Sequence, residues 1–126
     1  MTVGLVPWNF LIAISLRKAT AVLAAGCTVV VKPFPETPFH YSQFSSLAGK
    51  AGLGPGIFSA ITTDLKNTPS VYGTLCKHPL VIEVTLTGST SVGKLIPKQG
   101  PENLENATSE LEGNLPVYFV RQYSSG

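Results

Sequence analysis

The possible folds of this chain are limited most strongly by three short runs of apolar and β-branched residues. Segments of helical character separate these runs. The expected strands are residues 27–33, 56–62 and 80–88, and the expected helices are residues 10–26, 37–52, 67–78 and 89–96. Strands and helices that alternate at this spacing predict a parallel sheet joined by right-handed crossovers. We therefore predict an open α/β fold with helices flanking the sheet.

Glycine and proline mark the ends of the expected helices. Gly26 suits a C-cap of the first helix, and Thr37 followed by Pro38 suits the N-cap and first position of the second. The third strand has the clearest apolar pattern, with alternate positions occupied by Leu80, Ile82, Val84 and Leu86. This pattern predicts that the strand begins at Leu80.

Open parallel sheets bind ligands outside the carboxyl ends of their strands. Lys32 ends one expected strand, and a glycine-containing loop at residues 88–93 follows another. Both features therefore fall on the same edge of the predicted sheet. We expect the functional site at this edge.

The loop at residues 85–94 (TLTGSTSVGK) has two interpretations. Gly88 permits a tight turn, and the free N–H groups and positive dipole at the start of a helix favour a phosphate. Residues 88–94 also spell GxxxxGK, the start of a P-loop, but Leu95 stands where a P-loop has Ser or Thr. An ordinary strand–turn–helix joint is the alternative without a ligand. We favour the phosphate of a dinucleotide over a triphosphate.

Composition excludes several classes of partner. The 126 residues are 44% hydrophobic and 13% charged, which indicates one globular domain rather than a disordered chain. A formal net charge of +2 without a polybasic face argues against nucleic acid. Cys27 and Cys76 are far apart, with no CxxC and no histidine at ligand spacing, so neither a metal site nor a disulfide framework is expected. The apolar run at residues 4–16 is too short to span a membrane.

Four stretches, in this order and spacing, resemble the cofactor-binding domain of the NAD(P)-dependent aldehyde dehydrogenases. They are residues 7–10 (PWNF), 24–33 (AAGCTVVVKP), 87–94 (TGSTSVGK) and 109–113 (SELEG). The succinate-semialdehyde branch is the most similar, judged by RKA at 17–19, ETPF at 36–39 and KN at 66–67. The resemblance implies an incomplete, Rossmann-like cofactor-binding domain at residues 1–120, followed by a tail at 121–126 outside the family pattern.

The resemblance implies two catalytic residues. Asn9 matches the side-chain amide that, with a backbone N–H, holds the oxyanion, a kind of donor worth roughly 3–4 kcal/mol. An asparagine that caps its own turn is the alternative. Glu110 matches the general base that activates water. The family pattern Glu-Leu-Gly-Gly departs here at Glu112, in what we expect to be a turn.

Six residues match cofactor-binding positions of the family: Trp8, Lys32, Glu36, Gly56, Gly88 and Ser89. Lys32 resembles the lysine that bonds the adenosine ribose, and Ser89 the serine that contacts the pyrophosphate. Pro35 stands where the family has a polar or acidic ribose partner, with Glu36 adjacent. Core packing for Trp8 and a solvated charge for Lys32 are the alternatives. The implied cofactor is NAD or NADP, with NAD slightly favoured.

Arg17 matches an arginine that contacts the substrate carboxylate, which implies succinic semialdehyde as the small aldehyde substrate. An exposed helix arginine is the alternative. The family's cysteine nucleophile lies downstream of the glutamate, and neither Cys27 nor Cys76 matches it. We therefore expect a truncated product without dehydrogenase turnover of its own.

Two further interpretations stay open. The chain is alternatively a non-catalytic nucleotide-binding or interaction fragment that associates with full-length aldehyde dehydrogenase subunits, or a P-loop nucleotide-binding domain. The resemblance and the absence of a visible targeting segment lead us to expect a mitochondrial or cytoplasmic location.

Overall fold

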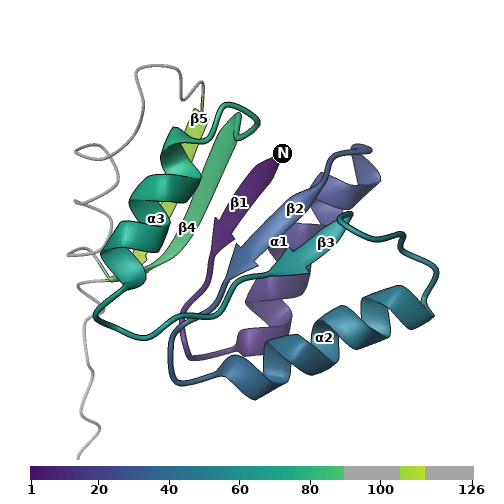
Figure 1. The fold of residues 1–126 in the computed structure, drawn as a ribbon, viewed down its shortest axis with the longest axis horizontal. Coiled ribbons are helices and arrows are strands. Elements are labelled where there is room, and N and C mark those ends of the chain that lie inside the picture. Colours follow the sequence, from purple (N-terminus) through teal and green to yellow (C-terminus); the bar gives the residue numbers. More distant parts are fainter. Residues whose placement is uncertain (90–105, 113–126) are drawn as a thin grey trace, which may run out of the picture.

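The computed structural model describes residues 1–89 and 106–112 of the chain (Figure 1). The elements within these residues are, in chain order, β1 (Thr2–Leu5), α1 (Leu11–Ala24), β2 (Val29–Lys32), α2 (Pro38–Lys50), β3 (Phe58–Ala60), α3 (Thr68–Lys77), β4 (Glu83–Ser89) and β5 (Asn106–Glu112). None of the helices in this part of the chain has the length and apolar character needed to cross a bilayer.

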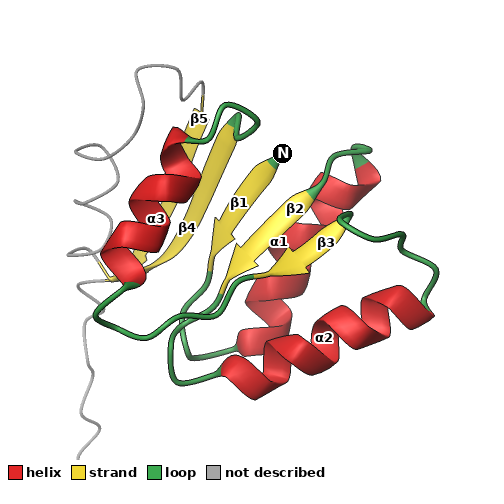
Figure 2. Ribbon diagram, viewed as in Figure 1, coloured by secondary structure: helices red, strands yellow, loops and turns green. Residues whose placement is uncertain are grey.

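The described strands form one parallel sheet in the order β3-β2-β1-β4-β5. Helix α3 covers one face, and helices α1 and α2 lie on the other (Figure 2). Each face has its own core. The core under α3 contains Val3, Leu5, Tyr72, Cys76, Val81, Val84 and Leu86, and the core under α1 and α2 contains Val6, Ala19, Val29, Val31 and Tyr41.

The predicted α/β class is confirmed, because parallel strands alternate with helices that bury one face each. Gly26 ends the first helix as expected, with φ +72° and an N–H that donates to the carbonyl of Leu23. Thr37 precedes α2 as predicted, but its hydroxyl does not cap the helix. The hydroxyl donates instead to the carbonyl of Phe34, at 3.0 Å.

Strand β1 was not among the predicted strands, although it lies at the centre of the sheet. Val3 pairs with Val30 on one side and with Val84 on the other. All four residues of β1 are buried. After Thr2 the strand continues without a polar side chain, which is typical of a strand that is covered on both faces. The proline that follows at position 7 is the signal that separates this run from the helix after it.

The prediction that the third strand begins at Leu80 is wrong. Strand β4 begins at Glu83, and Leu80 and Ile82 are 65% and 48% exposed. A turn holds this segment, because His78 accepts hydrogen bonds from the N–H groups of Leu80 and Val81. The helix expected at residues 89–96 lies outside the described residues, except that Ser89 belongs to β4.

Candidate nucleotide-binding site

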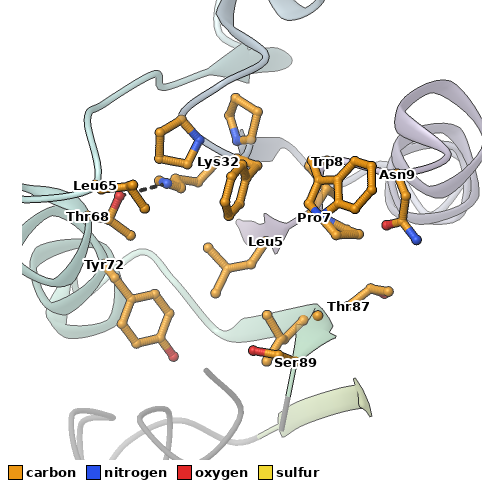
Figure 3. Close-up of a pocket in the computed structure, with 16 residues that line it drawn as sticks. Leu5, Pro7, Trp8, Asn9, Lys32, Leu65, Thr68, Tyr72, Thr87 and Ser89 are labelled. Carbon is orange, nitrogen blue, oxygen red and sulfur yellow. Dashed lines mark hydrogen bonds between the residues drawn. The ribbon is translucent and has the colours of Figure 1, made fainter. Parts of the chain in front are cut away.

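A cavity of about 380 Å³ opens at the carboxyl ends of β1, β2 and β4, the edge at which the site was expected (Figure 3). It is lined by Leu5, Val6, Pro7, Trp8, Asn9, Lys32, Pro33, Phe34, Pro35, Leu65, Thr68, Tyr72, Leu86, Thr87, Gly88 and Ser89. Five of the residues predicted to form the site, namely Trp8, Asn9, Lys32, Gly88 and Ser89, therefore meet at one cavity.

The loop between β1 and α1 carries Trp8 and Asn9 to the cavity. Phe10 ends this loop in the left-handed region, with φ 50° and ψ 38°, which is uncommon for a residue other than glycine. The Oδ1 atom of Asn9 is buried and has no hydrogen-bond partner among the described residues, so Asn9 does not cap its own turn there. Trp8 is 64% exposed, which argues against the core-packing alternative.

Lys32 is the last residue of β2, and its side chain is 4% exposed. Its ammonium donates to the hydroxyl of Thr68, the first residue of α3, at 3.0 Å (Figure 3). Burial lowers the pKa of Lys32 below its usual value of 10.5. The alternative of a freely solvated lysine is therefore wrong.

Glu110 lies beside the cavity, on β5. Its carboxylate Oε2 accepts a hydrogen bond from the hydroxyl of Thr87 at 3.0 Å, and the backbones of the two residues are paired in the sheet. The expectation of a turn at residues 109–113 is corrected here, because Glu110 and Glu112 belong to a strand and Glu112 pairs with Ser89. Strand pairing uses backbone N–H and carbonyl groups, so the polar sequence of β5 can still pair with β4 along its whole length.

Sequence reasoning missed Lys18, which does not line the cavity but interacts electrostatically with Glu110. It lies on α1, is 9% exposed, and its ammonium donates to the hydroxyl of Thr85 at 2.7 Å. Burial lowers the pKa of Lys18, while the negative charge of Glu110 acts in the opposite direction. Alternate positions of β4 are polar, namely Glu83, Thr85 and Thr87. Because alternate residues of a strand share one face, this pattern could have predicted a polar strip on the face of the sheet that α1 covers.

Four predicted site residues do not line the cavity: Glu110, which lies beside it, and three others that lie farther away. Glu36 is exposed in the loop before α2, one residue beyond the cavity wall. Arg17 is exposed on α1, because Lys18 takes the buried face of that turn. Gly56 precedes β3 with φ +79°, so the parallel arrangement places it at the opposite, amino edge of the sheet. There it lines a separate hollow of about 190 Å³.

Neither cysteine lies at the cavity. Cys76 belongs to α3 and is completely buried in the core between that helix and the sheet. Cys27 is in the turn between α1 and β2, at the amino edge of the sheet. No group of histidine, cysteine or carboxylate side chains that would hold a metal ion occurs among the described residues. Lys94 and Leu95, on which the P-loop alternative depends, lie outside the described residues.

Known proteins are similar to this chain in both sequence and fold. Over 110 residues the chain is 48% identical to succinate-semialdehyde dehydrogenase [NADP(+)] of Saccharomyces cerevisiae and 41% identical to the mitochondrial succinate-semialdehyde dehydrogenase of Homo sapiens. Each match covers 87% of the chain, but only 22% of the yeast protein and 21% of the human protein.

A solved structure of succinate-semialdehyde dehydrogenase from Burkholderia pseudomallei superposes with a TM-score of 0.81 and 37% identity, over 93% of this chain and 24% of that one. The predicted resemblance is thereby confirmed. Residues 1–123 match the aldehyde dehydrogenase family model, and this chain therefore belongs to the aldehyde dehydrogenase family.

Proposed function

We propose that these residues form the dinucleotide-binding part of an aldehyde dehydrogenase that oxidises succinic semialdehyde to the carboxylic acid with NAD or NADP. The observation that supports this proposal is the gathering of Asn9, Lys32, Gly88 and Ser89 around one cavity, with Glu110 beside it. The chain spans less than a quarter of the relatives named above, so the reaction of the whole enzyme enters only as part of this proposal.

The residues present fit a dinucleotide. Lys32 supplies a buried cation, and Gly88 and Ser89 end a strand at the edge where phosphates bind in such sheets. Lys32 would hold the adenosine ribose, and Gly88 with Ser89 would hold the pyrophosphate. When bound, NAD or NADP accepts the electrons that are removed from the aldehyde.

Asn9 and Glu110 are the proposed catalytic residues. Asn9 lines the cavity, and its buried Oδ1 atom has no hydrogen-bond partner among the described residues. A side-chain amide placed in advance can stabilise an oxyanion with little reorganisation. The carboxylate of Glu110 is oriented by Thr87 and lies near the buried cation of Lys18. In this position Glu110 would take a proton from water. Arg17 is exposed and remains a proposed contact for the substrate carboxylate.

Fluorescence of Trp8 tests the binding step directly. It is the single tryptophan of the chain, it is 64% exposed, and it lines the cavity. We expect NAD or NADP to change its emission in a saturable manner, and Lys32→Met to weaken that binding about tenfold. Lys50→Met, which alters an exposed lysine at the end of α2, is the matched control. A flat titration with both nucleotides would contradict the proposed function.

The same protein tests the expectation about turnover. Because neither cysteine lies at the cavity, the 126-residue chain supplies no thiolate there to attack an aldehyde. We expect no reduced nucleotide to form when the chain is mixed with succinic semialdehyde and NAD or NADP. Steady formation of reduced nucleotide, in proportion to the amount of chain, would overturn this expectation.

A second function, association with other aldehyde dehydrogenase subunits, is favoured by one observation. Phe10, Ile12 and Leu16, at and near the start of α1, are 76%, 59% and 41% exposed. Apolar residues grouped in this way are typical of a surface that another polypeptide covers. Co-purification of the tagged chain with an intact relative tests this function, and an Ile12→Lys variant should abolish the association.

A further inference from the structure

Two hydroxyl groups meet inside the apolar core under α1 and α2. Tyr41, on α2, is 2% exposed, and Ser15, on α1, is 1% exposed. Their oxygen atoms are 2.5 Å apart. A hydroxyl group in apolar surroundings destabilises the fold unless it is hydrogen-bonded, so each of these groups depends on its partner. The other buried residues of this core are all apolar: Val6, Ala19, Val29 and Val31.

The hydroxyl pair, Tyr41 and Ser15, is bonded to the first residue of α1. Ser15 donates its single proton to the carbonyl of Leu11, at 2.5 Å. Because that proton is engaged, the phenol of Tyr41 is the donor to the oxygen of Ser15. Burial raises the pKa of Tyr41, so the phenol keeps its proton at neutral pH. Helix α2 is therefore connected, through two hydrogen bonds, to the first turn of α1.

The start of α1 is not held by a capping side chain. Phe10 occupies the N-cap position without a side-chain hydrogen bond to the helix, and the first turn contains no acidic residue. The backbone of Phe10 is left-handed, with φ 50° and ψ 38°, and its ring is 76% exposed. A conformation of this kind persists only where the surrounding structure imposes it. The exposed ring supplies little packing, so the constraint has to come from the residues on either side of the loop.

Both ends of this loop are anchored at the same core. Val6, before the loop, is 5% exposed and belongs to the core under α1 and α2. Leu11, after the loop, packs against that core and accepts the hydrogen bond of the hydroxyl pair. Residues 7–10 lie between these anchors, and they include Trp8 and Asn9, which line the cavity (Figure 3). Release of the second anchor would therefore free the segment that carries these two side chains.

We propose that Tyr41 and Ser15 are positioning residues for the loop that carries Asn9, and that they hold its amide at the cavity before any ligand binds. This inference rests on the role proposed above for Asn9 in stabilising an oxyanion. Apolar contacts are non-directional and permit one helix to shift slightly along another, whereas hydrogen bonds require a defined geometry. The hydroxyl pair therefore fixes the first turn of α1 relative to α2, and the adjoining loop follows.

Nuclear magnetic resonance of the unliganded chain measures the order of this loop. Trp8 is the single tryptophan, so its indole N–H gives one signal, and Asn9→Ala identifies the side-chain amide of Asn9 by its disappearance. Tyr41→Phe removes the phenol oxygen and retains the ring. Loss of one hydrogen bond changes a conformational equilibrium about fivefold. We expect the population of displaced loop, measured by relaxation dispersion of both signals, to rise by about that factor.

A double variant separates the positioning role from stability. Tyr41→Phe combined with Ser15→Ala removes both hydroxyl groups and leaves neither without a partner, so its resistance to urea should be close to that of the wild type. The connection between the two helices is nevertheless absent, so the signals of Trp8 and Asn9 should stay broadened. Sharp loop signals in this variant would show that the hydroxyl pair serves stability alone, and would overturn the proposal.

Two exposed hydroxyl groups provide matched controls. Thr20, on α1, donates to the carbonyl of Leu16 at 2.6 Å, which repeats the bond that Ser15 makes one turn earlier. Ser42, on α2, donates to the carbonyl of Phe39 at 2.9 Å. Thr20→Val and Ser42→Ala should leave both loop signals unchanged.

The outcomes distinguish this inference from the proposed function. Unchanged loop signals in Tyr41→Phe, or equal broadening in the two controls, would overturn the positioning role. Either result would leave nucleotide binding unaffected, because the loop is measured without a ligand. A folded chain that binds neither NAD nor NADP would overturn the proposed function, whereas the hydroxyl pair would still be judged by the loop signals.

Discussion

Replacement of Lys32 by methionine should make the unliganded chain more stable, although it removes a hydrogen bond. The lysine is 4% exposed, and its ammonium has one neutral partner at 3.0 Å. Methionine has a similar length, is apolar, and adapts to irregular space in a core. The hydroxyl of Thr68 keeps its bond to the carbonyl of Asp64 in the variant, so no buried donor is left without an acceptor.

The magnitude follows from two opposing contributions. Loss of a hydrogen bond from a charged donor costs about 1.5–3 kcal/mol, whereas relief of a buried charge returns several kcal/mol. Replacement of a buried ion pair by apolar residues is often neutral or stabilising by about 1–4 kcal/mol. Lys32 has no anionic partner among the described residues, so for this residue we expect a net gain of about 2 kcal/mol. For a chain of this length, that corresponds to a rise in Tm of about 8 °C.

The pH dependence of this gain has a defined sign. Burial lowers the pKa of Lys32 in the folded chain below 10.5, its value in the unfolded chain. At pH values below the lowered pKa, Lys32 is protonated in both the folded and the unfolded chain, so the cost of burying its charge is fully present. As the pH rises from the lowered value to 10.5, the folded chain releases its proton first and the cost disappears. The advantage of the variant should therefore shrink through that window.

Urea unfolding of both proteins, followed by circular dichroism from neutral pH upward, measures the difference. Cys76, Tyr41 and Tyr72 have raised pKa values and also affect stability at alkaline pH, but they are common to both proteins and cancel in the comparison. A variant that is less stable than the wild type at neutral pH would refute the argument from the unpaired charge. A gain that stays constant up to pH 10.5 would refute the assignment to the ionisation of Lys32.

Three further predictions concern stability and reactivity. Phe10→Gly should raise the free energy of unfolding by about 0.5–1 kcal/mol, because glycine tolerates φ 50° and the phenylalanine ring is 76% exposed. As a control, Phe39→Gly in helix α2, where the ring is 80% exposed, should lower the free energy of unfolding by about 1 kcal/mol. Thr85→Val should cost about 1–3 kcal/mol in urea unfolding, because the ammonium of Lys18 loses its acceptor at 2.7 Å, and a neutral effect would show that Lys18 finds another partner. A thiol reagent should label Cys27 rapidly and Cys76 only after unfolding, because Cys76 is completely buried and burial raises the pKa of its thiol; rapid labelling of both cysteines in the native chain would contradict this.

Much of the fold could be predicted because it depends on local patterns. The β-branched run of β2, the Thr37 and Pro38 pair at the start of α2 and the glycine after α1 each act within a few residues. Strand β1 was missed because a buried parallel strand of four residues has no alternation to mark it. Leu80 was assigned to a strand because its apolar character fits the period, whereas the turn at His78 decides its exposure.

The edge at which the site lies followed from the sequence alone, since any parallel sheet brings the ends of its strands together. Which side chains meet there was decided by the tertiary structure. Lys32 bonds to Thr68, 36 residues away, and Lys18 bonds to Thr85, 67 residues away. No local pattern encodes such pairs, because they depend on how α3 and α1 cross the sheet. The same packing leaves Arg17 and Glu36 outside the cavity. It also buries the charge of Lys32, and burial of that charge destabilises the protein only once the helices cover the lysine.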